Sequence, residues 1–410
     1  MTTRYVYVLG TCDTKQAELG YIASTLRDSG VAARIVDVST RQAPAQADIS
    51  ARTVAGFHPR GEGAVFCGDR GRSIGAMAEA LRHYLTRCTD MAGVIAIGGS
   101  GGTALVAPAL QALPLGLPKL VVSTVASGNT APYVGGSDIA MLYSVTDMEG
   151  LNRLSRVILC NAAHAMAGMV QAPCASRADP RPAIGLTMFG VTTPCVDQVV
   201  HQLSGRFDCL VFHATGTGGR AMERLADDGT IRGLVDVTLT EFCDLVAGGI
   251  FPCDADRLGA PIRTGLPYVG SCGGLDMVNF GARDTVPEHY RQRRLVEHNP
   301  QITLMRTSAA ECGEMGRMIG RQLNRCEGEV RFLYPEGGFS SLDRPGGPFY
   351  DPEADEAFYA ALARTLEQTA RRRLIRLPHA INDPAFAAAL ADEFSRIFME
   401  STDNAQHSPQ

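Results

Sequence analysis

The sequence predicts an α/β protein made of two Rossmann-like subdomains, each a doubly wound parallel sheet, with a ligand cleft between the two. Three observations lead to this prediction. Short apolar runs rich in β-branched residues alternate with runs of helical periodicity along most of the chain. Polar, Gly-rich turns follow several of the strand-like runs. The alternation starts again after a Pro-containing stretch near 175–182, so we expect domains over 1–178 and 179–402, then a flexible tail at 403–410.

The composition is that of a globular protein with a large core. The chain has 410 residues, of which 45% are hydrophobic and 20% charged, and its net charge is −5. This charge gives no electrostatic reason to expect nucleic acid or an anionic membrane as a partner. No apolar run approaches the roughly 20 residues that span a bilayer. The twelve cysteines include no C-x-x-C pair, so we expect no disulfide framework, no protein-bound metal and a cytoplasmic location.

Strand-like and helical runs alternate through the first half of the chain. Buried strands are expected at 4–9, 34–38, 94–97 and 119–123, and helices at 19–26, 74–85, 103–112 and 151–170. The polar stretch 39–63 contains Pro44 and Pro59 and is expected to be a loop or a small excursion of the chain. Strands that alternate with helices in this way form a parallel sheet with right-handed crossovers.

Three small, polar turns follow predicted strands, at 10–15, 98–103 and 123–130. In an open parallel sheet such turns lie at the carboxyl edge, where ligands bind. The turn 98–103 joins a strand to a helix, so its backbone N–H groups and the positive helix end suit a phosphate. The alternative is a Gly-rich turn that binds nothing. The predicted nucleotide-binding residues are Thr11, Asp13, Thr14, Lys15, Gly98, Gly99, Ser100, Gly101, Gly102, Thr103 and Asn129.

These turns do not match the common nucleotide fingerprints. The stretch 98–103 lacks the G-x-x-x-x-G-K-[ST] spacing, and the first turn has no G-x-G-x-x-G, which disfavours a nicotinamide cofactor. Thr103 could give a hydroxyl to phosphate or to a Mg²⁺-bound water, and Lys15 a point charge. Lys15 is one of only two lysines in an Arg-rich chain. Asp13 could hold Mg²⁺ or simply cap the helix that follows.

The second half of the chain repeats the same pattern of elements. Strands are expected at 183–189, 209–213, 302–305, 330–334 and 374–377, and helices at 308–325, 353–371 and 384–399. The strand 209–213 ends in a second Gly-rich turn, which begins with His213. The predicted ligand residues of this turn are Thr215, Gly216, Thr217, Gly218, Gly219 and Arg220.

The second Gly-rich turn offers candidates for acid–base chemistry. A histidine at the carboxyl end of a strand is well placed for acid–base work near neutral pH, and Glu241 could be its carboxylate partner. The alternative is a buried His213 that hydrogen-bonds to the backbone. Cys272 is a further candidate nucleophile, although no activating base can be identified beside it. The chain has no H-E-x-x-H motif, which argues against the zinc proteases that carry it.

Several of these runs resemble a known family. The runs 10–15, 98–103, 190–196, 211–223, 275–281 and 345–349 are similar to the Tm-1-like ATP-binding domain family, whose plant member is a tobamovirus resistance protein. The resemblance covers roughly 4–395 and implies two Rossmann-like subdomains, a cytoplasmic protein and ATP, with Mg²⁺ as a candidate companion. Plant members continue into a barrel domain that this chain lacks, so a separate barrel-domain partner is expected. The antiviral role does not carry over, because it depends on partner surfaces.

The leading hypothesis is an ATP-binding enzyme, or enzyme subunit, that acts on a small metabolite. Its phosphates would lie on 10–15 and 98–103, and His213 with Glu241 would be the catalytic residues. The runner-up is a nucleotide-sensing module without turnover that controls a partner enzyme. A third option is a hydrolase or lyase that uses His213 without nucleotide. A homo-oligomer is expected in each case.

Overall fold

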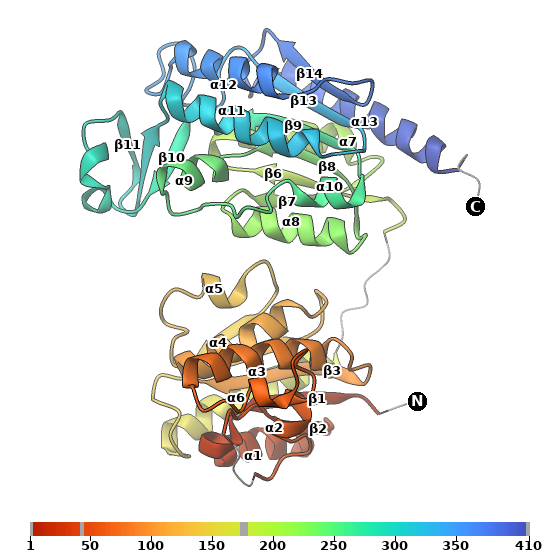
Figure 1. Cartoon of the computed structure of the whole chain (residues 1–410), viewed down its shortest axis with the longest axis vertical. Coiled ribbons are helices and arrows are strands. Elements are labelled where there is room, and N and C mark those ends of the chain that lie inside the picture. The colour runs from red at the N-terminus through yellow and green to blue at the C-terminus, as the bar shows by residue number, and fades with distance from the viewer. Residues whose placement is uncertain (1–2, 42–44, 173–178, 407–410) are drawn as a thin grey trace. The chain divides into compact units, whose positions relative to one another are not determined.

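The chain folds into two compact units, residues 1–177 and 178–410, each of which is described here by itself (Figure 1). The structure is a computed structural model that describes residues 3–41, 45–172 and 179–406, with side chains described as far as Ser401. The first half of the predicted linker at 175–182 lies outside the described residues, which resume at Asp179.

The first unit is built on a five-stranded parallel sheet in the order β2-β1-β3-β4-β5. The strands are β1 (Tyr5–Gly10), β2 (Ala33–Asp37), β3 (Met91–Gly98), β4 (Lys119–Ser123) and β5 (Ala140–Tyr143). The strand order reverses between β1 and β3. In a doubly wound sheet the loops that leave such neighbouring strands diverge to opposite faces and open a crevice at the carboxyl edge.

Helices cover both faces of this sheet. On one face α1 (Cys12–Asp28) and α6 (Arg153–Gln171) bury a cluster around Val8, Leu19 and Leu159. On the other face α2 (Ala51–Ala55), α3 (Arg70–Leu85) and α4 (Ser100–Gln111) pack over Leu9 and Val94. A 3₁₀ turn (Glu62–Ala64) precedes α3, and the short α5 (Ala131–Val134) lies against α4. The predicted loop 39–63 therefore contains α2 and this turn.

The second unit contains a six-stranded parallel sheet in the order β14-β13-β9-β8-β6-β7. Its strands are β6 (Ala183–Met188), β7 (Asp208–His213), β8 (Ile231–Thr238), β9 (Tyr268–Gly273), β13 (Val330–Pro335) and β14 (Arg372–Leu377). A small antiparallel sheet adds β10 (Met277–Phe280), β12 (Ile302–Arg306) and β11 (Leu295–Asn299). Both large sheets are parallel and flanked by helices, so the predicted fold class is confirmed.

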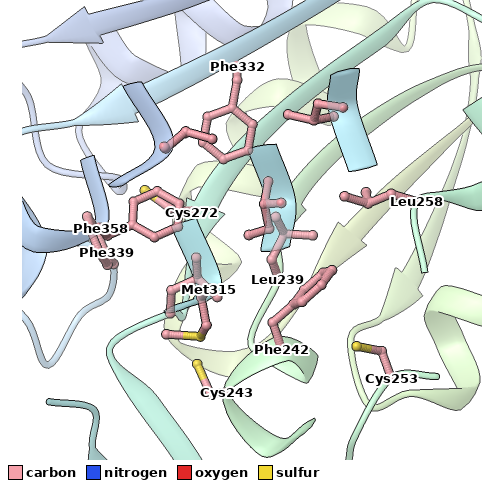
Figure 2. Close-up of a cluster of buried hydrophobic side chains, with 14 of the residues drawn as sticks. Leu239, Phe242, Cys243, Cys253, Leu258, Cys272, Met315, Phe332, Phe339 and Phe358 are labelled. Carbon is pink, nitrogen blue, oxygen red and sulfur yellow. The ribbon is translucent and has the colours of Figure 1, made fainter. Parts of the chain in front are cut away.

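The second unit also has helices on both faces of its large sheet. One face carries α7 (Thr193–Leu203) and α13 (Pro384–Gln406). The other carries α8 (Thr217–Asp227), α9 (Glu241–Ala247), α10 (Gly259–Thr264), α11 (Ala309–Asn324) and α12 (Pro352–Thr365). Short 3₁₀ turns lie at Gly190–Thr192, Arg283–Thr285 and Glu288–Tyr290. Figure 2 shows part of the core, where Met315, Phe332 and Phe358 fill the space between sheet and helices.

Element ends differ from the predictions at the carboxyl-terminal helices. Helix α12 ends at Thr365 rather than at 371, and α13 continues to Gln406. Residues 403–406, expected in a flexible tail, are therefore helical, and 407–410 lie outside the described residues. No described helix combines the length and the apolar character needed to cross a bilayer.

Candidate functional site

A cavity of about 460 Å³ opens at the carboxyl edge of the first sheet, where the strand order reverses. Two of the three predicted turns meet there. The turn after β1 contributes Thr11, Thr14 and Lys15, and the turn after β3 contributes residues 99–102. The beginning of α3 and the segment after β2 complete the walls. The sequence-based expectation of one shared edge for these two turns is therefore met by the fold.

The amino end of α4 is open to this cavity. Its N-cap residue, Gly99, has an extended backbone and provides no side-chain cap. Thr103 donates its N–H to the Gly99 carbonyl as the first intrahelical bond of the turn. The preceding N–H groups of Ser100, Gly101 and Gly102 have no intrahelical acceptor, as in every helix. Together with the helix dipole they form a site suited to an anion.

The amino end of α1 is satisfied from within the protein. Cys12 donates its N–H to the Asp37 carboxylate at 3.0 Å, and Asp13 donates its N–H to Ser39 Oγ at 3.2 Å. The N-cap residue is Thr11, which makes no side-chain cap bond. Asp13 is thus not the cap; its carboxylate accepts a hydrogen bond from Ser39 and lines the cavity. Of the two helix ends, only that of α4 offers N–H groups to a ligand.

Three cationic side chains line the cavity: Lys15, Arg41 and Arg70. The Lys15 ammonium donates to the carbonyl of Met148, which holds it in place while leaving two of its N–H donors. Arg41 and Arg70 are exposed, and within the described part of the chain neither guanidinium has an ion pair. Two carboxylates, Asp13 and Asp69, also line the cavity, so its positive excess is modest.

The glycines of the second turn have different roles. A Cβ on Gly98 would lie 2.9 Å from the Gly102 Cα, so Gly98 permits the close approach of β3 and α4. A Cβ on Gly101 would meet nothing nearer than Ile74 Cδ1 at 3.7 Å and an Arg70 nitrogen at 3.9 Å. Position 101 therefore has room for a side chain, which would project into the cavity.

Three predicted nucleotide-binding residues do not line the cavity: Gly98, whose role in packing is given above, Thr103 and Asn129. Thr103 is buried, and its hydroxyl lies 2.8 Å from the Gly99 carbonyl and 2.6 Å from Ser123 Oγ. It fastens α4 to β4 and is not free to bind phosphate or a Mg²⁺-bound water. Asn129 accepts the N–H of Ala131 at 3.1 Å in the third turn, away from the cavity walls.

His213 lies at the end of β7, as predicted, and is exposed. Its ring stacks on Phe189 with 4.9 Å between centroids, and its Nδ1 lies 3.1 Å from the Met188 carbonyl. The Thr215 hydroxyl donates to the His213 carbonyl at 3.4 Å. The alternative of a buried histidine is wrong, but among the described residues no carboxylate contacts the ring.

The glycines of the His213 turn are required by packing. A Cβ on Gly218 would lie 1.8 Å from the His213 carbonyl oxygen, and one on Gly219 would lie 2.8 Å from both Glu241 oxygens. Gly216 has a φ of 74° and donates its N–H to Glu241 Oε1 at 2.6 Å. Thr217 then begins α8, and Arg220 lies 3.8 Å from Asp254. Close packing thus accounts for a turn that the sequence assigned to a ligand.

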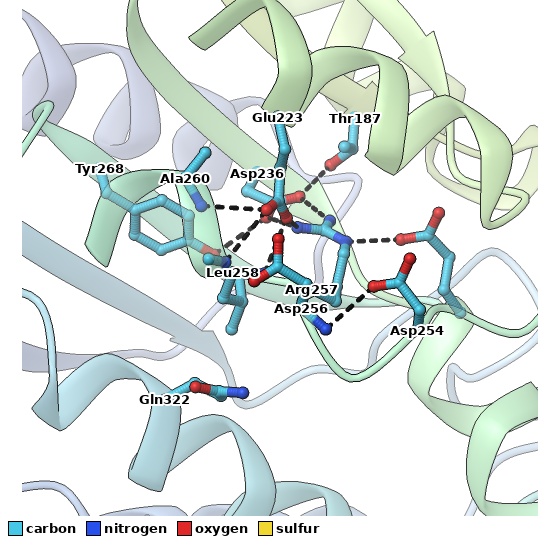
Figure 3. A network of polar contacts seen from close by, with 12 residues as sticks. Thr187, Glu223, Asp236, Asp254, Asp256, Arg257, Leu258, Ala260, Tyr268 and Gln322 are labelled. Atoms are coloured by element: carbon cyan, nitrogen blue, oxygen red, sulfur yellow. Dashed lines mark hydrogen bonds and ion pairs between the residues drawn. The ribbon is translucent and has the colours of Figure 1, made fainter. Parts of the chain in front are cut away.

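A buried network is centred on Arg257 (Figure 3), and Glu241 is one of its members. The Arg257 Nε donates to Glu241 at 2.7 Å, and its terminal nitrogens donate to Asp236 at 2.7 and 2.8 Å and to Glu223 at 3.0 Å. All four side chains are at least nine-tenths buried. Burial alone would lower the pKa of Arg257, but the three carboxylates raise it well above its usual value.

The outer members of this network fix the surrounding loops. Glu223 accepts the N–H groups of residues 258–260, and Asp236 accepts the hydroxyls of Thr187 and Tyr268. Burial raises the pKa of Glu223, against the lowering effect of Arg257. Because both oxygens of Glu241 are committed to Gly216 and Arg257, the geometry favours a structural role over the predicted catalytic one.

A second buried cluster of charged side chains, with Arg306 among three aspartates, also lies in the second unit. Arg306 pairs with Asp355 at 2.6 Å and lies 3.9 Å from Asp343, while Asp276 accepts the Ser340 hydroxyl at 2.7 Å. Burial, reinforced by the charge of Asp343, raises the pKa of Asp276 to about 7 and that of Asp355 to about 8.

Cys272, the candidate nucleophile, lies fully buried in β9. Burial raises the pKa of its thiol well above the usual value, which makes it a poor nucleophile.

Sequence reasoning missed Arg41, Arg70 and Arg257. Arg41 and Arg70 lie outside the three turns, and the fold alone brings them to the cavity. Their only sequence signal was position. Arg41 follows a predicted strand and Arg70 precedes a predicted helix, which are places near the carboxyl edge of the sheet. Arg257 lies in an irregular loop, and no spacing pattern links it to Asp236 or Glu241.

Comparisons with known proteins extend over both units. Residues 4–175 match the N-terminal domain of the uncharacterised protein family UPF0261, and residues 181–398 match its C-terminal domain. A UPF0261 protein of Mesorhizobium japonicum is 56% identical over 387 residues, covering 94% of this chain and 97% of that protein. One from Rhizobium meliloti is 56% identical over 393 residues, covering 96% of this chain and 98% of that protein.

The resemblance to the Tm-1-like proteins is also confirmed. The ToMV resistance protein Tm-1(GCR237) of Solanum lycopersicum is 42% identical over 422 residues, covering 97% of this chain. The match spans 56% of the tomato protein. The matches to both domains cover most of the chain, and the chain belongs to the uncharacterised protein family UPF0261.

Proposed function

We propose that the first unit binds ATP, with its phosphates against the amino end of α4. The observation that carries the proposal is the uncapped turn 99–102, which opens into a cavity lined by Lys15, Arg41 and Arg70. Backbone N–H groups and cations in one concave site suit a phosphate chain better than a single carboxylate. Among phosphate-bearing ligands we propose ATP because the sequence resembles the Tm-1-like ATP-binding domain family.

Mg²⁺ would enter this site together with the triphosphate. Asp13 and Asp69 line the same cavity and offer carboxylate oxygens, which Mg²⁺ prefers, commonly through bound water. Among the described residues no group of three or more His, Cys, Asp or Glu side chains is arranged to hold a metal by itself. The phosphates would therefore supply most of the direct ligands, as in many ATP sites.

The bound nucleotide could serve either catalysis or sensing. An enzyme, or enzyme subunit, that acts on a small metabolite would use His213, which is exposed at the end of β7. A nucleotide-sensing module without turnover is favoured by a different observation. Glu241, the expected partner of His213, is committed to Gly216 and Arg257. ATP binding without product formation would distinguish the sensing module from the enzyme.

The test compares two arginines of the same helix. Isothermal titration with ATP, with and without Mg²⁺, should show binding to the wild type and a loss of roughly tenfold or more in Arg70→Gln, because a charge-assisted contact is removed. Arg72→Gln is the matched control, because Arg72 is also exposed on α3 but lies outside the cavity walls. Absence of binding by the wild type, or equal losses in both variants, would contradict the proposal.

A further inference from the structure

A second cavity, of about 310 Å³, adjoins the first and opens at the carboxyl end of β2. Arg41 lines both cavities. The segment 66–68 also borders both, because Phe66 lines the second cavity and Gly68 lines the first. An extended ligand whose phosphates lie on α4 could therefore continue past Arg41 into this second space.

The walls of the two cavities differ in chemistry. The first is lined almost entirely by polar and glycine residues, with only Ile74 and Leu105 as apolar side chains. The second also has polar walls, from Asp37, Arg41, Ser50 and Arg52, but it adds the half-buried ring of Phe66 and three alanines, Ala45, Ala47 and Ala51. A flat heterocyclic base gains most from apolar and aromatic walls, whereas phosphates need donors and cations. The two spaces thus match the two ends of a nucleotide.

Asp37 gives the second cavity a polar anchor. Its Oδ1 accepts the N–H of Cys12 at 3.0 Å and the N–H of Ser39 at 2.9 Å. Within the described part of the chain, its Oδ2 has no recorded hydrogen bond, and Asp37 lines the cavity. A rigidly held carboxylate at the end of β2, beside a base-sized apolar space, is suited to accept hydrogen bonds from ribose hydroxyls.

We infer that this second cavity is a nucleoside subsite, in which Phe66 and the alanines hold the base and Asp37 accepts from the ribose. The first unit then holds the whole nucleotide and distinguishes it from simple polyphosphates. The inference rests on the proposed phosphate site, since the two subsites act on one ligand. It names the part of the chain that selects nucleotides.

The first experiment compares three ligands by calorimetry: ATP, 2′,3′-dideoxy-ATP and inorganic tripolyphosphate, each with Mg²⁺. ATP should bind at least about tenfold more tightly than tripolyphosphate, and the dideoxy compound should lose roughly tenfold against ATP, because its hydrogen bonds to a charged acceptor are missing. Equal affinity for ATP and tripolyphosphate would overturn the nucleoside subsite while leaving the phosphate site intact. Binding of none of the three would overturn both.

The second experiment fills the cavity. Ala45 is exposed on its wall, so Ala45→Trp should place an indole in the space without disturbing the core. ATP affinity should fall to that of tripolyphosphate, and tripolyphosphate affinity should stay unchanged. The control is Ala17→Trp, at an exposed alanine of α1 outside both cavities. Unchanged ATP affinity in Ala45→Trp would overturn the inference, as would an equal loss for both ligands.

Discussion

The substitution Glu241→Gln tests whether Glu241 has a structural or a catalytic role. Glu241 is fully buried, with Gly216 N–H at 2.6 Å and Arg257 Nε at 2.7 Å. Glutamine keeps one acceptor oxygen but removes the charge and faces the other donor with an amide nitrogen. Removing one partner of a buried ion pair typically lowers the free energy of unfolding by about 3–5 kcal/mol. For Glu241→Gln we expect a loss of about 3 kcal/mol, at the lower end, because one hydrogen bond can persist.

The assay is urea unfolding followed by circular dichroism, since the chain contains no tryptophan to report by fluorescence. Hydrogen exchange should locate the effect, with faster exchange in peptides that cover 213–220. The matched control is Glu356→Gln, because Glu356 pairs with Arg376 at 3.0 Å with about half of its side chain exposed. Exposed pairs of this kind contribute less than about 1 kcal/mol. Equal, small losses in both variants would refute the structural role.

Three further predictions follow from the same geometry. Gly101→Asp should abolish ATP binding without unfolding the chain, because position 101 has space for a side chain and the new carboxylate would repel phosphate. The control is Gly20→Asp, at a position of α1 where a Cβ would have nothing within 4 Å, and this variant should bind ATP normally. Retained ATP binding in Gly101→Asp would count against the phosphate site. Burial raises the pKa of Asp244 and Asp276 to about 7 and that of Asp355 to about 8. In the folded state these three carboxyl groups keep protons that they release near pH 4 in the unfolded chain. The free energy of unfolding should therefore fall as pH rises from about 4 to about 8. A higher urea midpoint at about pH 8 than at about pH 6 would contradict these pKa shifts. Among the described cysteines, Cys67 should react first with substoichiometric iodoacetamide. Its thiol is exposed, and hydrogen bonds from Ser73 and the Asp69 backbone lower its pKa. Peptide mass spectrometry that finds another described cysteine modified first would contradict this prediction.

The alternating pattern was sufficient to predict most strands of the two large sheets and most of their long helices. Apolar strands such as 94–97 and amphipathic helices such as 74–85 are recognisable because their burial follows from a local period. The antiparallel strands β10 and β11, the edge strand β5 and the short helices α2 and α5 were missed, because elements of four or five residues carry too little periodicity. Strand β9 and helices α9 and α10 were also not predicted.

The candidate site could be predicted only in part, for a different reason. The turns 10–15 and 98–103 were found because Gly-rich sequence follows strands. Arg41, Arg70 and Phe66 reach the cavities through packing of loops that have no period. In the His213 turn the same Gly-rich signal misled, because there the glycines serve close packing against Glu241 and the His213 carbonyl. The homo-oligomer, the barrel-domain partner and the cleft between the units stay predictions.

The central claim, that the amino end of α4 holds phosphates, is tested most directly by a crystal structure of the full chain with ATP and Mg²⁺. The account predicts phosphate oxygens within hydrogen-bonding distance of the N–H groups of Ser100, Gly101 and Gly102, with Arg70 close by. Phosphates bound at the His213 turn, or anywhere else with the amino end of α4 left vacant, would contradict it.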